Sequence, residues 1–465
     1  MGSDDATPPA ADDQSPDGTP YDLDFPDGQT PDGMHPEGVT PDGTPSDGTP
    51  IGDPLVVPPE ASDVPPEASE VQPEVAEASR ATSGFARPSA GAIILAIVVV
   101  AATVTAGLLL SRPDEPPVER TSLPLDAWLP YWTLDETTES RIDEVDTMRD
   151  VSPFWYSAEG VDEIVIDPNA DPDTTDRFLD LLRESGADVV PSIVDALPAG
   201  QMAAILDDPE TRTQHVDAIV AFAEDGDFDG IDLDYERFAF FDGRDTWEST
   251  RPNWVAFVEE LGAELHADGR TLTVSIPPIY DGDRSSSSGY WVYDHGAIAP
   301  HVDRIRIMAY DYSVGEPGPI APLSFVQRSV DGALDVGVDR EKLVLGIPIY
   351  GRNWPIGVSG TCPAGTELED VTSVNLRTID DLIARRSAVP VFDDVTGESS
   401  FEYDIEFSDD STSCTQSRSV HYVDPLGARL RTDIALEEGL DGVSLWAFGF
   451  DDERVWEELG PRISS

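Results

Sequence analysis

The sequence predicts an α/β protein, a (β/α)8 or TIM barrel with a small α+β insertion between its seventh and eighth strands. Three observations predict this fold. Strand-like runs alternate with amphipathic stretches over residues 124–465, a cluster of acids ends the fourth run, and the last two runs are separated by far more than a helix. Roughly 340 residues can bury one large core. A disordered acidic tail and a single transmembrane helix are expected to precede the barrel.

The first segment, residues 1–88, is of low complexity. Pro-Asp-Gly or a close variant recurs at Pro16, Pro26, Pro31, Pro36 and Pro41. Such triplets favour isolated turns, and a segment with almost no aromatic residues has nothing to pack. We expect a disordered, acidic tail rich in Pro, Asp and Gly.

The second segment, residues 90–110, is apolar throughout except for Thr103 and Thr105. As a helix it would span roughly 30 Å, the thickness of a bilayer core. It begins too far into the chain for a cleaved signal peptide. We expect one uncleaved transmembrane helix, followed by a polar linker over residues 113–123.

Charge and cysteines indicate the partners and the topology. The chain has 92 acidic and 28 basic residues and a net charge of −64, which excludes nucleic acid as a partner.

Arginines are balanced on the two sides of the apolar segment, so charge alone gives no orientation of the chain in the membrane. Cys362 and Cys414 are the only cysteines and would form a disulfide in an oxidising compartment, although two buried free thiols are the alternative. This favours a cytoplasmic N-terminus and an extracellular C-terminal domain at the cell membrane.

The barrel strands are expected to be eight apolar or alternating runs. They are Leu125–Trp132, Val151–Tyr156, Ala187–Val194, Phe228–Tyr235, Thr271–Pro277, Val302–Tyr310, Leu343–Tyr350 and Gly442–Ala447. The helices between them are expected at Asp173–Glu184, Asp207–Glu224, Pro252–Ala267, Pro322–Gly332 and Pro425–Glu438.

The insertion is expected over residues 357–424, where both cysteines lie. It has a helical stretch, Thr378–Arg386, and three alternating runs, Val389–Phe392, Ser400–Phe407 and Ser419–Val423. This mixture predicts a small α+β unit on the rim of the barrel. The alternative is a loop without a functional role that is closed by a disulfide.

The fourth strand carries the chemistry. Its alternation directs Asp232, Asp234 and Glu236 to one side of the strand, after Asp229 at its start. Neighbouring carboxyls in a partly dry site cannot all ionise, so at least one pKa must rise, as a general acid requires. A solvated acidic loop is the alternative in so acidic a chain, but the regular spacing favours a strand and its exit at the catalytic end of a barrel.

These four acids resemble the signature of glycoside hydrolase family 18, Asp-x-x-Asp-x-Asp-x-Glu, at every position. The resemblance implies Glu236 as the general acid, Asp234 and Asp232 as its catalytic partners, and Asp229 as a brace for the strand. Met308, Tyr310 and Asp311 match the Met-x-Tyr-Asp of the same family. There the tyrosine hydroxyl bonds the substrate's acetamido carbonyl, and Met and Asp line the same subsite.

Aromatic residues at the same end of the barrel are expected to bind sugar rings. Trp446 matches the tryptophan that forms the hydrophobic floor of the family's site, and a flat indole suits the apolar face of a pyranose. Tyr131 and Trp354 are candidates for stacking on neighbouring sugars. The histidines show no metal-ligand spacing, and no cofactor is expected.

Two departures bear on the substrate. The third strand, Ser192-Ile193-Val194-Asp195, lacks the Ser-x-Gly-Gly of many chitinases, and Tyr235 precedes Glu236 where many have tryptophan. Segments such as Ser152–Tyr156 look more like the spore-germination and cortex-lytic branch, which acts on peptidoglycan.

The resemblance therefore implies a membrane-anchored extracellular hydrolase that cleaves β-1,4 bonds at N-acetylglucosamine, with peptidoglycan as the expected glycan. The implied mechanism is retaining and substrate-assisted, without an enzyme nucleophile. Three alternatives stay open: a chitinase acting on chitin oligomers, a glycan-binding lectin of the same fold, and a wall-associated structural or signalling protein.

Overall fold

The structure, a computed structural model, describes residues 121–142, 148–279 and 289–464, except the side chains of residues 245, 289 and 290. The predicted tail (1–88), the predicted transmembrane helix (90–110) and most of the predicted linker (113–123) lie outside these residues. Within the described ranges, no helix is both long enough and apolar enough to span a bilayer.

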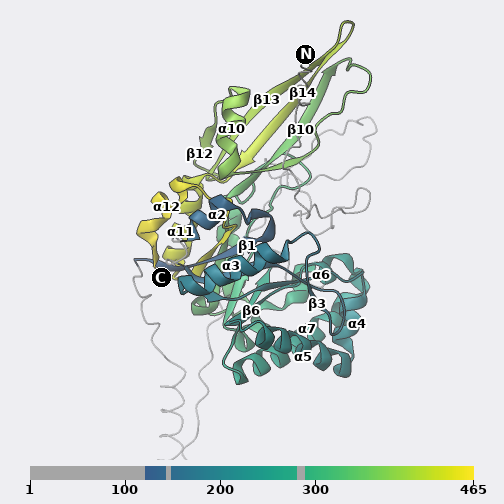
Figure 1. Cartoon of the computed structure of the whole chain (residues 1–465), viewed down its shortest axis with the longest axis vertical. Helices are drawn as coiled ribbons and strands as arrows, with labels where there is room; N and C mark the ends of the chain where they lie inside the picture. Colours follow the sequence, from purple (N-terminus) through teal and green to yellow (C-terminus); the bar gives the residue numbers. More distant parts are fainter. Residues whose placement is uncertain (1–120, 143–147, 280–288, 465) are drawn as a thin grey trace, which may run out of the picture. The chain divides into compact units, whose positions relative to one another are not determined.

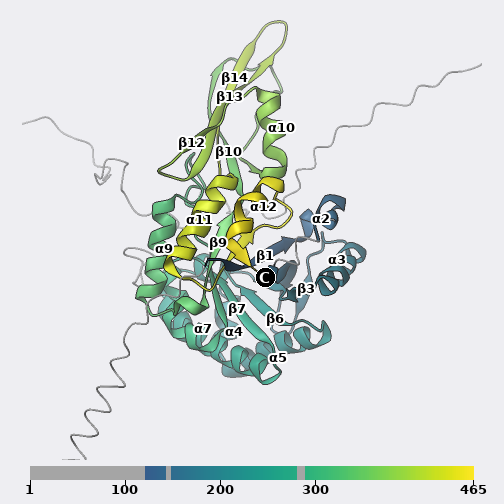
Figure 2. The ribbon, with the colours of Figure 1, turned by 90° about the vertical axis from the view of Figure 1, so that its left-hand side faces the viewer.

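Within the described residues, eight parallel strands close into the predicted barrel (Figures 1 and 2). They follow chain order around the barrel, and the last pairs with the first through Leu125 and Val443. These strands are β1 (Leu123–Pro130), β2 (Met148–Ala158), β5 (Ser192–Asp195), β6 (Gly230–Asp234), β7 (Thr271–Ile276), β8 (Arg304–Ile307), β9 (Leu343–Pro348) and β15 (Gly442–Trp446). Three short strands extend the sheet: β3 (Ile164–Ile166), β4 (Asp188–Val189) and β16 (Ile463–Ser464).

The helices pack around these strands and bury their apolar faces against them (Figure 2). They are α2 (Glu136–Ser140), α3 (Pro172–Ser185), α4 (Gln201–Asp207), α5 (Pro209–Asp225), α6 (Arg237–Phe241), α7 (Arg244–Ala267), α8 (His295–Ile298), α9 (Leu323–Asp335), α11 (Pro425–Glu438) and α12 (Glu453–Leu459). Short 3-10 turns lie at Tyr131–Thr133, Gly289–Tyr293, Ala299–His301, Arg340–Lys342 and Gly460–Arg462.

Two elements differ from the sequence-based expectation near proline residues: one strand is interrupted at a proline, and one helix continues through a proline. The expected third strand is divided into β4 and β5, since Pro191 has no N–H for the ladder. The expected helix from Pro252 begins instead at Arg244, with Pro252 inside it. Trp247, only 6% exposed, lies in the first turns of α7, and its burial favours the helix despite the hydrogen bond that the proline removes.

The insertion is an antiparallel five-stranded sheet with one helix, which is an α+β unit as the sequence predicted, although only three of its strands were expected. The strand order is β11-β10-β14-β13-β12. The elements are β10 (Tyr350–Gly360), β11 (Thr372–Asn375), α10 (Leu376–Arg386), β12 (Val391–Asp393), β13 (Glu398–Ser408) and β14 (Ser413–Tyr422). The sheet therefore begins before residue 357, because β10 starts two residues after β9 ends. Alternation along β13 buries Phe401, Tyr403 and Ile405 and leaves the intervening acids exposed.

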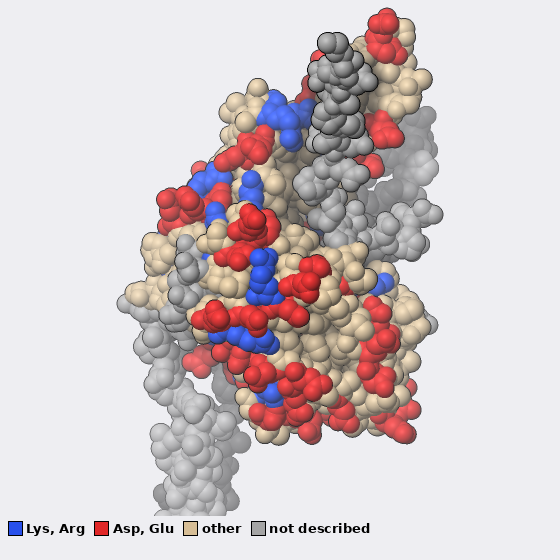
Figure 3. Space-filling view, in the orientation of Figure 1, with Lys and Arg blue, Asp and Glu red and all other residues tan. Residues whose placement is uncertain are grey.

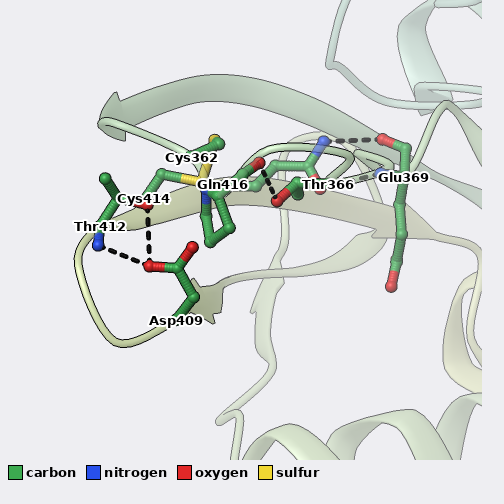
Figure 4. Close-up of a disulfide and its surroundings, with 8 residues drawn as sticks. Cys362, Thr366, Glu369, Asp409, Thr412, Cys414 and Gln416 are labelled. Carbon is green, nitrogen blue, oxygen red and sulfur yellow. Dashed lines mark hydrogen bonds between the residues drawn. A yellow bond between two sulfur atoms is a disulfide. The ribbon is translucent and has the colours of Figure 1, made fainter.

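Cys362 and Cys414 form a disulfide (Figure 4). It joins the loop after β10 to β14, and two hydrogen bonds between Gln416 and the backbone of Glu369 hold the same loop further along, at 2.7 and 3.1 Å. The predicted pairing of the two cysteines is present, and it fixes the loop after β10 to the sheet of the insertion.

Acidic side chains are widespread over the face of the barrel shown in Figure 3, and basic ones are fewer. The acidity of the chain is thus also a property of its folded part, where it serves solubility.

Candidate active site

Asp229 directly precedes β6, at the end of the strand opposite to Asp234 and Glu236. Its carboxylate accepts the backbone N–H of Val189 at 2.8 Å, and its own N–H donates to the Val189 carbonyl at 3.0 Å. These bonds join the start of β6 to β4. Asp229 therefore braces the strand and is separate from the candidate catalytic groups.

Asp232 is fully buried inside the barrel and accepts four hydrogen bonds. The donors are Ser192 Oγ at 2.6 Å, Ser275 Oγ at 2.7 Å, Trp128 Nε1 at 3.0 Å and Arg306 Nη1 at 3.2 Å. They come from four different strands, β5, β7, β1 and β8. Such a shell, with one positive charge in it, suits a carboxylate anion held in a single orientation.

Asp234 lies two residues further along β6, and its surroundings contain fewer hydrogen-bond donors than those of Asp232. Burial, together with the nearby carboxyls of Glu236, Asp232 and Asp195, raises the pKa of Asp234 well above its ordinary value. Its Oδ1 has no hydrogen-bond partner among the described residues. A buried oxygen without a partner is costly, and a bound substrate that donates a hydrogen bond would satisfy it.

Glu236 follows β6 and occupies the residue before α6. Burial, with the charges of Asp195 and Asp311, raises its pKa to about 7. A glutamic acid with this pKa is about half protonated at pH 7, so the state that a general acid needs is well populated there.

Tyr310 and Asp311 lie just after β8, at the same end of the barrel. The ring of Tyr310 lies 6.2 Å from that of Tyr350, measured between centroids. Burial, Tyr350 and the charges of Glu236 and Asp234 raise the pKa of Tyr310 well above its ordinary value. Asp311 accepts hydrogen bonds from Tyr350 Oη at 2.6 Å and Arg352 Nη2 at 2.9 Å. Met308, 7% exposed, is buried on the same segment.

Trp446 lies at the end of β15 in a wall of aromatic rings. Its ring lies 4.9 Å from Phe154, 5.7 Å from Trp128 and 6.5 Å from Trp132, measured between centroids and always edge to face. Tyr131 extends this wall, with its ring 5.0 Å from that of Trp132. The structure thus brings Trp446 and Tyr131 into one cluster of aromatic rings, and Trp128 connects the cluster to Asp232.

Trp354 lies apart from this wall. Its side chain is 1% exposed, its Nε1 donates to the carbonyl of Val314 at 2.7 Å, and its ring packs on His421. Trp354 therefore has no exposed ring face on which a sugar could stack, and this expectation was wrong. The residue instead packs the insertion against the loop after β8.

Several residues that complete the site were not identified from the sequence as site residues: Ser192, Ser275, Trp128, Arg306 and Asp195. The sequence signal that could have found them is the alternation of side chains along each barrel strand. Ser275 alternates with Thr273 on the inward side of β7, and Arg306 lies two residues before Met308, the predicted site residue that follows β8. That signal finds inward positions but does not say which of them meet across the barrel.

Comparisons with known proteins find similar sequences and similar folds. A family model described as "Glycosyl hydrolases family 18" matches residues 163–451. A Bacillus subtilis protein named as the sporulation-specific glycosylase YdhD is 30% identical over 156 residues, which are 33% of this chain and 34% of that relative. The chain thus spans about a third of that relative's length.

Two solved structures share the fold. The chitinase of Chromobacterium violaceum ATCC 12472 superposes with a TM-score of 0.60 and 24% identity, over 73% of this chain and 98% of that one. The spore cortex-lytic enzyme SleL of Bacillus megaterium QM B1551 superposes with a TM-score of 0.60 and 17% identity, over 75% of this chain and 76% of that one.

Proposed function

Because the chain belongs to glycosyl hydrolase family 18, as the acid signature predicted, and is a chitinase-like glycosidase, we propose that it cleaves β-1,4 bonds at N-acetylglucosamine in peptidoglycan. The observation that carries the proposal is the buried Glu236, whose pKa is raised to about 7, two residues after the unpartnered buried oxygen of Asp234. The likeness to a sporulation-specific glycosylase and to a spore cortex-lytic enzyme supports peptidoglycan as the glycan.

The proposed mechanism uses the substrate's own acetamido group as the nucleophile. Glu236 gives its proton to the glycosidic oxygen as the bond to the anomeric carbon breaks, and the acetamido carbonyl oxygen bonds that carbon. Asp234 accepts the acetamido N–H, and the hydroxyl of Tyr310 donates to the acetamido carbonyl. Water then attacks the anomeric carbon and gives a proton to the Glu236 carboxylate, while the bond from that carbon to the acetamido oxygen breaks and restores the acetamido group. Two successive displacements at the anomeric carbon retain its configuration.

A chitinase acting on chitin oligomers is the second candidate. The Chromobacterium violaceum chitinase is matched over 98% of its length, and the aromatic wall around Trp446 would suit consecutive sugars of either glycan. The two candidates share Glu236, Asp234 and Tyr310, so they differ in substrate rather than in chemistry.

Product analysis separates these candidates. The full-length protein is incubated with purified peptidoglycan and separately with chitin oligomers, and the products are identified by mass spectrometry. We expect reducing N-acetylglucosamine ends from peptidoglycan and little product from chitin. Cleavage of chitin oligomers alone would instead identify a chitinase, and binding without any product would identify a lectin.

We propose further that residues 90–110 anchor the protein in the cell membrane, with the N-terminus in the cytoplasm and the barrel outside. The Cys362–Cys414 disulfide supports an oxidising compartment for the barrel. Cell fractionation tests the anchor: the full-length protein should sediment with membranes, and a variant without residues 90–110 should not. Degradation of the barrel by protease added to intact spheroplasts would support the orientation, and protection of the barrel would contradict it.

A further inference from the structure

Asp195, the last residue of β5, contacts the chain just after Glu236, where the neighbouring strand β6 has ended. Its Oδ1 accepts the backbone N–H of Arg237 at 2.8 Å, and its Oδ2 accepts that of Phe238 at 2.7 Å. The side chain is 1% exposed. Both oxygens are therefore occupied by the first turn of α6, some forty residues away in sequence.

This arrangement replaces an ordinary helix cap. The residue before a helix usually accepts a first-turn N–H with its own side chain. Glu236 holds that position in α6 and makes no such bond. Asp195 satisfies the N–H groups in its place, so the carboxyl of Glu236 stays available for a substrate.

The charges around Glu236 come from several elements. They are Asp195 from β5, Asp234 and Asp232 from β6, Arg237 from α6, Arg306 from β8, and Tyr310 and Asp311 from the segment after β8. The charge of Asp311 is offset by its ion pair with Arg352 at 2.9 Å. Asp195 has backbone donors instead of an ion pair within 4 Å among the described residues, so its negative charge opposes ionisation of Glu236.

Burial raises the pKa of Asp195 to about 7, as it does that of Glu236, so the two buried carboxyls compete for a proton. The two backbone N–H groups that Asp195 accepts lower its pKa, since a protonated oxygen is a poorer acceptor, and they favour the state in which Asp195 is ionised and Glu236 keeps the proton. We propose that Asp195 is a positioning residue for Glu236: it caps α6 in place of the glutamate side chain, and its carboxylate keeps the proton on Glu236. This inference rests on the proposed role of Glu236 as general acid.

Asp195→Asn tests the proposal, because asparagine keeps the shape and one acceptor but removes the charge. The alkaline limb of the pH profile of kcat/KM reports loss of the proton from Glu236. Without the neighbouring negative charge Glu236 ionises more easily, so we expect this limb to move to lower pH by about one unit. Asp195→Ser, which keeps a good capping oxygen, should give the same shift if the asparagine variant does not fold.

Asp452→Asn is the matched control. Asp452 also caps a helix, α12, by accepting two backbone N–H groups, those of Arg454 and Val455, but it is not one of the charges that raise the pKa of Glu236. Its replacement should leave the pH profile unchanged. A purely structural role for Asp195 would lower kcat at every pH without moving the limb, and that result would overturn the proposal.

A measurement independent of turnover separates this proposal from the proposed function. In ¹³C NMR of protein labelled at the glutamate side-chain carboxyl, the Glu236 resonance is identified by its loss in Glu236→Gln. Its titration midpoint should fall by about one pH unit in Asp195→Asn. An unchanged midpoint would refute the role of Asp195, even if the protein hydrolyses neither glycan.

Discussion

Replacing Glu236 by glutamine is expected to lower kcat on the glycan substrate by about 10²- to 10⁴-fold, the usual contribution of a positioned general acid. Glutamine has the same shape but no proton to give to the leaving oxygen. The carboxyl of Glu236 is buried and makes no capping bond, so folding should be unaffected. The measurement is the steady-state rate, with the thermal unfolding midpoint of the same sample beside it.

Glu224→Gln provides the matched control, since Glu224 is an exposed glutamate near the end of α5. Its replacement should leave kcat within twofold of the starting protein. Glycan binding by Glu236→Gln should persist in calorimetry, because Trp446 and Tyr310 are intact. Substantial turnover by Glu236→Gln would show that another group protonates the leaving oxygen.

The barrel was predictable because its signals are local. Alternating runs such as Thr271–Pro277 and amphipathic stretches such as Asp173–Glu184 each contain their own evidence for a strand or helix. The acid signature on β6 is equally local, since alternation alone places Asp232 and Asp234 on one face. These features need no knowledge of what lies opposite.

The rest of the site depends on contacts between distant residues. Asp195 is 42 residues from Arg237, and Trp128 is 104 residues from Asp232. Trp354 failed as a sugar-stacking candidate because its side chain is buried, and its indole N–H donates to the carbonyl of Val314, 40 residues earlier. A sequence pattern can show that a side chain points inward, but the partner that it meets is decided by how the barrel closes.

Arg306 illustrates the same point with the largest expected effect on stability. This fully buried guanidinium faces three fully buried carboxylates, at 3.2 Å from Asp232, 3.6 Å from Asp126 and 3.7 Å from Asp150. It also donates to Ser152 Oγ at 2.6 Å and lies over the ring of Trp128. The interior of this barrel is therefore ionic below the catalytic acids.

Arg306→Met is expected to lower the free energy of unfolding by about 3–5 kcal/mol, because removing one partner leaves buried charge uncompensated. The measurement is urea-induced unfolding of the variant and the starting protein. Arg340→Met is the control, because Arg340 forms a half-exposed ion pair with Glu438, and its loss should cost less than about 1 kcal/mol.

The double variant Arg306→Met with Asp232→Asn tells which carboxylate depends most on Arg306. Asp126 and Asp150 keep ion pairs with Arg149 and Arg304, at 2.7 and 2.8 Å respectively, so Asp232 is the acid left without a cation within 4 Å. Neutralising it should recover more than about 1 kcal/mol of the loss. If the double variant is no more stable than Arg306→Met alone, then Arg306 stabilises the fold through its packing on Trp128 and its ion pairs with Asp126 and Asp150 rather than through Asp232.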